Sequence, residues 1–288
     1  MAFVTHSNRV YLSLCFLLVT IAFPAFSGPG VQDTLIERLL REGQYRQMSN
    51  RIEGLLKKQN ASSGNDLRLY YYNKLSMANF RLNNFDSALI CSRQALELSS
   101  GSKDSALISD AWKMMAYSYN RLGHLDSALY FSRKLLNYAK RAGDDRQYRN
   151  ALVSMGTILM QNQRPADALK NFLEANRINK RIKDTASIAI DNFNIGLVHL
   201  KLKQYDSCLY YMNEVLGILK NGPRPDLLFI TYGTLADCYM EMGKKAEQKK
   251  YLLLAMEVAE QIRSYQYMAM GYCTLIEGSL YERVLKVQ

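Results

Sequence analysis

Apolar residues recur along this chain at intervals of three and four, which is the spacing of one face of an α-helix. In one clearly patterned segment Trp112, Met115 and Tyr119 follow this spacing. Gly123 interrupts the pattern, and a second apolar stripe begins near Leu125. Glycine often ends a helix because it adopts backbone conformations that other residues avoid. The pattern therefore predicts two helices joined by a short turn.

This helix–turn–helix pattern returns every 40 residues across most of the chain. A fixed period indicates one structural unit that is copied and stacked, with each copy burying its apolar face against its neighbours. Small residues recur at one position of the first helix, which would let the second helix approach closely. Asp104, Asp144 and Asp184 recur as predicted N-caps, because an aspartate oxygen can accept bonds from free amides at a helix start. The predicted turns begin at Gly43, Asn83, Gly123, Gln163, Lys203 and Gly243, and the small positions are Ala116, Gly156, Gly196 and Ala236.

The order of Trp112, Met115-Ala116, Tyr119, Gly123 and Ala128 resembles the tetratricopeptide repeat. The resemblance runs from about residue 33 to residue 288 and implies helix pairs that bind another molecule without chemistry of their own. The common tetratricopeptide period is 34, and the longer period here implies about three extra residues in each helix. HEAT and armadillo repeats share the longer period, but the tight turn and the contact between small residues favour the tetratricopeptide interpretation.

We therefore predict an all-α protein: a right-handed α-solenoid of about six helix pairs, closed by a C-terminal capping helix. No segment shows the alternation of apolar and polar residues that indicates a half-buried strand. The solenoid is expected to cover residues 28–288. Its predicted units are 33–62, 66–102, 104–142, 145–182, 185–222 and 225–262, with the capping helix at 265–286.

The N-terminus has the composition of a secretory signal. Residues 1–9 carry one arginine and no acidic residue, residues 10–23 are almost wholly apolar, and small residues precede a cleavage site before Gly28. The apolar segment is too short to span a membrane easily. We expect residues 1–27 to be removed, and the mature chain to be exported, periplasmic or envelope-associated in a bacterium, without a transmembrane helix.

Charge and cysteine content narrow the choice of partners. The formal charge is +11, or +10 without Arg9, which is typical of a solvated basic surface or of attraction to acidic partners, including a membrane surface. Because the chain is expected outside the cytoplasm, nucleic acid is not an expected partner. Four cysteines would remain in the mature chain, and each falls where a modest apolar residue would serve, which favours reduced structural thiols. Cys208 and Cys238 are the first pair to test for a disulfide, since they lie in consecutive units.

The chain shows no combination of residues that predicts catalysis. Its three histidines lie far apart, so no metal site is predicted and no Ser-His or Cys-His pair is expected. His199 occupies a position that is filled by tyrosine in other units, which favours a structural role. No glycine-rich phosphate loop follows a strand. We expect no enzyme and no cofactor.

In tetratricopeptide arrays the first helix of each unit lines a concave groove, and the resemblance implies the same here. The first half of that expected surface is basic and rich in side-chain amides, which would suit an extended peptide with acidic groups. The expected groove residues are Asn73, Lys74, Met77, Arg81, Lys113, Tyr117, Asn120, Arg121, Ser154, Thr157, Gln161, Asn194, Leu197 and Lys201.

Two functions fit these expectations. The first is an exported adaptor that binds a protein or peptide in an envelope-associated assembly. The second is an extracytoplasmic sensor or input module of a bacterial signal-transduction regulator; because the sequence reaches Gln288 without a membrane helix or output domain, such a module would be stand-alone or truncated. An outer-membrane factor associated with carbohydrate or lipid is a third class, supported only by the basic charge.

Overall fold

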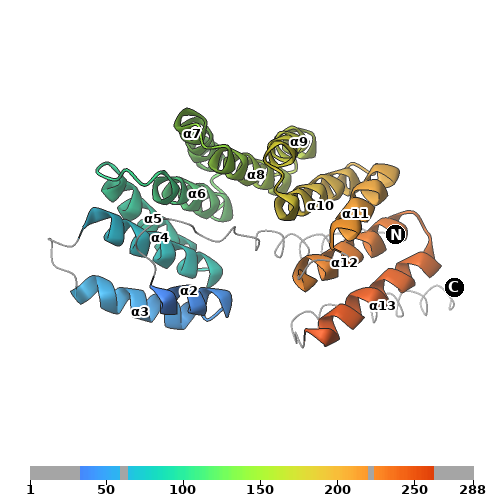
Figure 1. Cartoon of the computed structure of the whole chain (residues 1–288), viewed down its shortest axis with the longest axis horizontal. Helices are drawn as coiled ribbons and strands as arrows, with labels where there is room; N and C mark the ends of the chain where they lie inside the picture. The colour runs from blue at the N-terminus through green and yellow to red at the C-terminus, as the bar shows by residue number, and fades with distance from the viewer. Residues whose placement is uncertain (1–32, 59–63, 220–223, 263–288) are drawn as a thin grey trace, which may run out of the picture. The chain divides into compact units, whose positions relative to one another are not determined.

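The computed structural model describes residues 33–58, 64–219 and 224–262, and these residues form α-helices and no strands (Figure 1). Consecutive helices pack as pairs joined by short turns, and each pair packs on the next one along the chain. This arrangement confirms the predicted all-α solenoid. We call the first helix of each pair helix A and the second helix B. The A helices are α2 Thr34–Arg41, α4 Asn65–Arg81, α6 Ser105–Arg121, α8 Asp145–Gln161, α10 Thr185–Lys201 and α12 Pro225–Glu241. The B helices are α3 Tyr45–Lys58, α5 Phe85–Ser99, α7 Leu125–Ala142, α9 Pro165–Ile182, α11 Tyr205–Leu219 and α13 Lys245–Gln261.

The turn within each pair has the same backbone form. One residue of the turn has a left-handed conformation, as at Gly123 with φ 81° and Lys203 with φ 59°. The following amide then bonds back across the turn; for example, His124 N donates to Tyr119 O at 2.9 Å. Such bonds satisfy carbonyl groups that a helix end would otherwise leave free. The six left-handed residues in these turns are Gly43, Asn83, Gly123, Gln163, Lys203 and Gly243.

Aspartate caps begin several A helices, as the sequence predicted. The Asp104 carboxylate accepts bonds from the amides of Ala106 and Leu107 at 2.9 and 3.1 Å. Asp144 caps α8 in the same way, and Asp184 caps α10 by accepting from the amide and the hydroxyl of Ser187. Each cap pairs free amide donors with a carboxylate at the positive end of the helix dipole, which fixes where the helix starts.

Helices A and B of a pair approach closely at small residues. A Cβ atom added to Gly156 would lie 2.7 Å from the ring of Phe172, and one added to Gly196 would lie 2.5 Å from the terminal methyl of Met212. Both distances are shorter than van der Waals contact. The predicted role of the small A-helix position is therefore confirmed at these two pairs.

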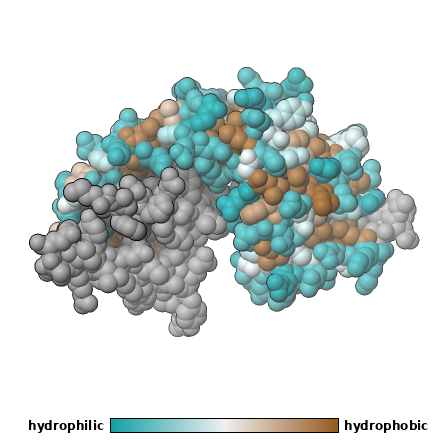
Figure 2. Space-filling model, turned by 180° about the vertical axis from the view of Figure 1, so that it is seen from behind, coloured by the Kyte–Doolittle hydropathy of each residue, from teal (hydrophilic) through white to brown (hydrophobic). Residues whose placement is uncertain are grey.

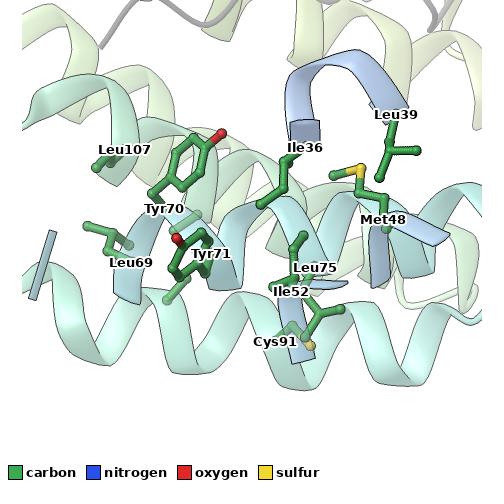
Figure 3. Packing of buried hydrophobic residues seen from close by; sticks show 13 residues of the cluster. Ile36, Leu39, Met48, Ile52, Leu69, Tyr70, Tyr71, Leu75, Cys91 and Leu107 are labelled. Carbon is green, nitrogen blue, oxygen red and sulfur yellow. The ribbon is translucent and has the colours of Figure 1, made fainter. Parts of the chain in front are cut away.

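The described residues form two compact units. The N-terminal unit ends at Ile178, and the C-terminal unit begins at Asn179, so the division falls within α9. Figure 3 shows the first core of the N-terminal unit, where Ile36 and Leu39 of α2 pack with Met48 and Ile52 of α3. Tyr70 and Tyr71 of α4 join the same cluster. Each pair thus buries its apolar face against the next pair along the chain.

Two sequence predictions concern segments beyond this description. The predicted secretory signal, residues 1–27, and the predicted capping helix, 265–286, lie outside the described residues. Both stay predictions.

Candidate functional site

Consecutive A helices of the N-terminal unit pack directly on one another. α4 contacts α6, and α6 contacts α8, in addition to the contacts that each makes with its B helices. Helix α6 therefore has A-helix neighbours on both sides. These A–A contacts include several polar side chains that bond from one helix to the next.

Hydrogen bonds join α6 to α8 along the whole length of both helices. Near the start of the helices, Gln147 donates to Ser105 at 2.7 Å and Ser109 donates to Gln147. In the middle, Tyr117 donates to Ser154 at 3.1 Å. The end of the contact has two further bonds: Asn120 donates to Gln161, and Asn162 donates to Asn120 at 2.6 Å. We call these residues, together with Asn73, the polar ladder.

Asn73 extends the polar ladder to α4. Its side-chain amide is almost wholly buried and donates to the backbone carbonyl of Leu107 in α6 at 2.8 Å. Each ladder bond joins residues that are 34 to 42 positions apart, so it connects one repeat to the next. Buried polar groups of this kind favour one register between neighbouring helices, because a shifted register would leave the buried groups without partners.

A buried charge cluster lies at the α2 end of the ladder. Lys74 Nζ is 2.5 Å from Glu37 Oε1, and the Tyr70 hydroxyl donates to the same oxygen at 2.8 Å. Lys74 is fully buried. Burial lowers the pKa of Lys74, although the Glu37 carboxylate partly opposes the shift. Burial and the bond to Glu37 both raise the pKa of Tyr70, so this hydroxyl stays protonated.

A second ion pair lies on α6 itself. Lys113 Nζ is 2.5 Å from the buried carboxylate of Asp110, one helical turn earlier. Burial raises the pKa of Asp110 above its ordinary value, with Lys113 acting in the opposite direction. Two arginines at the ends of α4 and α6 lie over aromatic rings, Arg81 over Tyr45 and Arg121 over Phe85. Arg121 is exposed, so it adds positive charge beside the ladder.

The predicted groove residues fall into three groups. Some are buried and hold helices together: Asn73, Lys74, Met77, Ser154, Asn194 and Leu197. Others are partly exposed in the N-terminal unit: Arg81, Lys113, Tyr117, Asn120, Thr157 and Gln161. Arg121 and Lys201 are exposed. Asn194, Leu197 and Lys201 belong to α10, in the C-terminal unit. The structure therefore brings Asn120 together with Gln161, and Tyr117 together with Ser154, through hydrogen bonds of the polar ladder.

The sequence prediction missed several members of this site. Glu37, Asp110, Gln147 and Asn162 all bond to residues that it named or to their neighbours. The 40-residue register offered a signal for Gln147 and Asn162, since they lie 42 positions after Ser105 and Asn120. Glu37, the partner of Lys74, gave no such signal, because an ion pair between helices depends on tertiary packing. Asp110 and Lys113 are three residues apart on one helix, a spacing that the sequence does show.

His199, which the sequence analysis considered for a chemical role, packs against other side chains of its own helix pair. His199 stacks on Tyr211 with ring centroids 5.5 Å apart, and its Nδ1 lies 2.7 Å from Gln204. Tyr119 stacks on Phe131 at the corresponding place in its pair. Over the described ranges, no three His, Cys, Asp or Glu side chains gather as a metal ion would require. None of the helices described is both long enough and apolar enough to cross a membrane.

The outer surface of the B helices is also partly apolar. Ile90 and Tyr130 occupy the same repeat position and are both more than half exposed, as is Tyr210. Figure 2 shows one face of the molecule, on which hydrophobic areas lie among hydrophilic ones. Scattered exposed apolar side chains are ordinary in soluble chains and define no site alone.

The described helices form an all-α solenoid of stacked helix pairs with a repeated A-helix face. A family model described as tetratricopeptide repeat matches residues 69–101 and 230–262. These ranges cover most of the pairs α4–α5 and α12–α13. No curated protein sequence matches this chain.

Solved structures share the fold at low sequence identity. A Rap protein complexed with Competence and Sporulation Factor is 15% identical and has a TM-score of 0.67, over 91% of this chain and 79% of that one. Aspartyl phosphate phosphatase F from Bacillus subtilis is also 15% identical, with a TM-score of 0.65, over 94% of this chain and 80% of that one. PlcR from Bacillus thuringiensis, in complex with the peptide PapR7 and DNA, is 15% identical and has a TM-score of 0.56, over 64% of this chain and 67% of that one.

Proposed function

We propose that this protein is a non-enzymatic scaffold that binds a protein or peptide with acidic groups on the polar ladder of its N-terminal unit. The observation that carries the proposal is the row of side-chain amides and hydroxyls that joins α6 to α8 from end to end. Amides and hydroxyls both donate and accept hydrogen bonds, so they can pair with the backbone of an extended peptide.

The charges beside the ladder support an acidic partner. Arg121 is exposed at the end of α6, while Arg81 and Lys113 are partly exposed nearby along the A helices. Arginine pairs with carboxylates through two parallel hydrogen bonds, which gives both attraction and orientation. The formal charge of the whole chain, +11, would also attract an acidic partner over distance.

The solved structures of similar fold support a protein or peptide as the ligand. PlcR holds the peptide PapR7, and the Rap protein holds Competence and Sporulation Factor. Their likeness to this chain is one of fold, so the extension to a peptide ligand here is part of our proposal. One similar structure is named as a phosphatase, but the polar ladder contains no nucleophile paired with a base.

We further propose that the protein acts outside the cytoplasm, in an envelope-associated assembly. The support is the order of charged, apolar and small residues in 1–27. N-terminal sequencing of the protein recovered from the envelope fraction of an expressing bacterium should begin at Gly28. Recovery of the uncleaved chain from the cytoplasm would contradict export and would leave the ladder proposal untouched.

The ligand class can be tested by selection from a library of short random peptides displayed on phage, with the full chain immobilised. We expect enriched peptides to be rich in Asp and Glu. The synthetic form of an enriched peptide should bind Asn120→Ala about tenfold more weakly, because the ladder loses the amide that takes part in both bonds at its end. Asn137→Ala is the matched control, since Asn137 is exposed on the B helix α7. Equal affinity for both variants, with unchanged thermal unfolding, would contradict a site on the ladder.

A further inference from the structure

Two buried cysteine side chains meet where the fifth helix pair packs on the sixth. Cys208 lies in α11 and Cys238 in α12, and neither has any exposed surface. Helices α11 and α12 pack against each other. Cys238 Sγ lies 3.8 Å from the carbonyl oxygen of Tyr205, which is one helical turn before Cys208. The Cys238 side chain therefore lies against the turn of α11 that carries Cys208.

This junction differs in sequence from the equivalent junctions between other helix pairs. Cys208 occupies the small position of helix B, which is alanine at residues 88, 128 and 168. Cys238 lies 30 residues after Cys208, in the A helix of the next pair. The same spacing elsewhere places Ala88 with Ser118 and Ala128 with Ile158. Among the described repeats, thiols occupy both positions at this junction alone.

The electrostatics of the pair differ from those of an isolated buried thiol. The neighbouring Cys208 thiol lowers the pKa of Cys238, and Cys238 together with burial raises the pKa of Cys208. Cys91, which is buried in the N-terminal unit, has its pKa raised to about 11 by burial. A thiolate is the reactive species in disulfide exchange, so Cys238 is the member of the pair that ionises first when local opening admits an oxidant.

We propose that Cys208 and Cys238 form a disulfide that fastens the fifth helix pair to the sixth under oxidising conditions. The oxidant is a small disulfide or a dithiol–disulfide oxidoreductase. The Cys238 thiolate attacks one oxidant sulfur, breaks its S–S bond and releases one thiol. Cys208 then loses its proton and attacks the mixed disulfide, which forms the Cys208–Cys238 bond and releases the second thiol. Two protein thiols are thereby oxidised, and one disulfide is reduced to two thiols.

The bond would stabilise the C-terminal unit. It closes a segment of 30 residues between α11 and α12, which restricts the unfolded chain. We expect the oxidised protein to have a Tm about 5 °C higher than the reduced protein. This inference does not depend on the peptide-binding proposal, because the pair lies in the C-terminal unit and its chemistry requires no partner.

The test uses the full chain, equilibrated with oxidised and reduced glutathione and then alkylated with N-ethylmaleimide. Trypsin separates the two cysteines by cutting after Lys220. Mass spectrometry should find the peptides that contain Cys208 and Cys238 joined in the oxidised sample, with Cys91 alkylated. Cys91→Ser should give the same joined peptides and the same change of Tm. In Cys208→Ser the joined peptides and the Tm difference should both be absent.

Two results would overturn the proposal. One is separate alkylation of Cys208 and Cys238 after equilibration with oxidised glutathione alone. The other is a bond from either residue to Cys15, Cys91 or Cys273, or to a second chain. A joined pair with an unchanged Tm would overturn the stabilising role. If Cys208→Ser does not fold, mass spectrometry of the unmodified protein still shows whether the peptides that contain Cys208 and Cys238 are joined.

Discussion

The two units differ in which helices the polar side chains of their A helices join. Each unit has bonds of both kinds: Ser154 and Thr157 donate within α8 in the N-terminal unit, and Asn179 of α9 donates to Asp191 of α10 at 2.6 Å in the C-terminal unit. In the N-terminal unit, Asn73 of α4 and Asn120 of α6 bond to the next A helix. In the C-terminal unit, Thr231 and Thr234 donate to carbonyls of their own helix α12, at 2.6 and 2.9 Å. A hydroxyl that bonds within its own helix is satisfied without any neighbour. Bonds between helices, in contrast, line up several polar groups from different repeats on one surface.

This difference separates a candidate binding surface from a packing surface. In addition to Thr231 and Thr234, α12 buries Leu227, Phe229 and Leu235. Helix α10 buries Phe193 and Ile195. Both A helices also bury polar side chains, among them Asp191, Asn192 and Asn194 of α10. The A helices of the N-terminal unit combine amides, hydroxyls and ion pairs, and several of their hydrogen bonds run from one A helix to the next. For this reason we place the proposed ligand-binding surface on the N-terminal unit, and the experiments below are chosen to challenge that choice.

The largest effect is expected from the buried ion pair of the N-terminal unit. Glu37→Ala removes the carboxylate that Lys74 and the Tyr70 hydroxyl share. We expect the free energy of unfolding to fall by about 3 kcal/mol, because Lys74 would stay buried without this anion. Urea denaturation monitored by circular dichroism measures the change.

The control for this variant is an exposed ion pair. Glu174→Ala removes the partner of Arg177, whose side chain is 78% exposed, and should cost less than about 0.5 kcal/mol. Equal effects of the two substitutions would show that the Glu37 cluster contributes no more than a surface pair.

A smaller effect should come from the close approach of helices A and B. In Gly156→Ala the new methyl would press on the flat ring of Phe172, and we expect a loss of about 2 kcal/mol. In Gly196→Ala the neighbour is the flexible end of Met212, so the loss should be smaller. Gly233→Ala meets no atom within 4 Å and should stabilise the protein by up to about 1 kcal/mol, because alanine is the better helix former. Thermal unfolding that ranks the three variants differently would contradict this packing.

The smallest stability effect should come from the turns. Lys203 has a left-handed backbone, with φ 59°, which favours glycine. Lys203→Gly should therefore raise the free energy of unfolding by about 1 kcal/mol. The reverse change at the equivalent turn, Gly123→Ala, should lower it by a similar amount, since Gly123 has φ 81°. Chemical denaturation curves that show no change for either variant would contradict strain at this position.

Local features of the fold could be predicted from the sequence with little ambiguity. The caps Asp104, Asp144 and Asp184 bond where the repeat placed them, because an N-cap needs only its own next residues. The glycine pattern also predicted the turns, and Gln163 and Lys203 share the left-handed form despite their side chains. These features depend on a few neighbouring residues.

The candidate site could be predicted only in part. The repeat register identified Asn120 and Gln161 as members of one surface, and the structure joins them by a hydrogen bond. It also placed Lys74 on that surface, whereas Lys74 is fully buried against Glu37. Glu37 comes from α2, which is only eight residues long. Because a buried ion pair depends on how neighbouring repeats pack, a sequence period alone could not reveal it.

The most direct test of the central claim compares one change of charge in each unit. Arg121 and Lys201 occupy the same position of their A helices, 80 residues apart, and both are exposed. An acidic peptide enriched on the full chain is titrated by calorimetry into the unmodified protein, Arg121→Glu and Lys201→Glu. We predict that Arg121→Glu weakens binding about tenfold and that Lys201→Glu changes it less than about twofold. Equal weakening by both variants, or weakening by Lys201→Glu alone, would contradict a binding surface on the N-terminal unit.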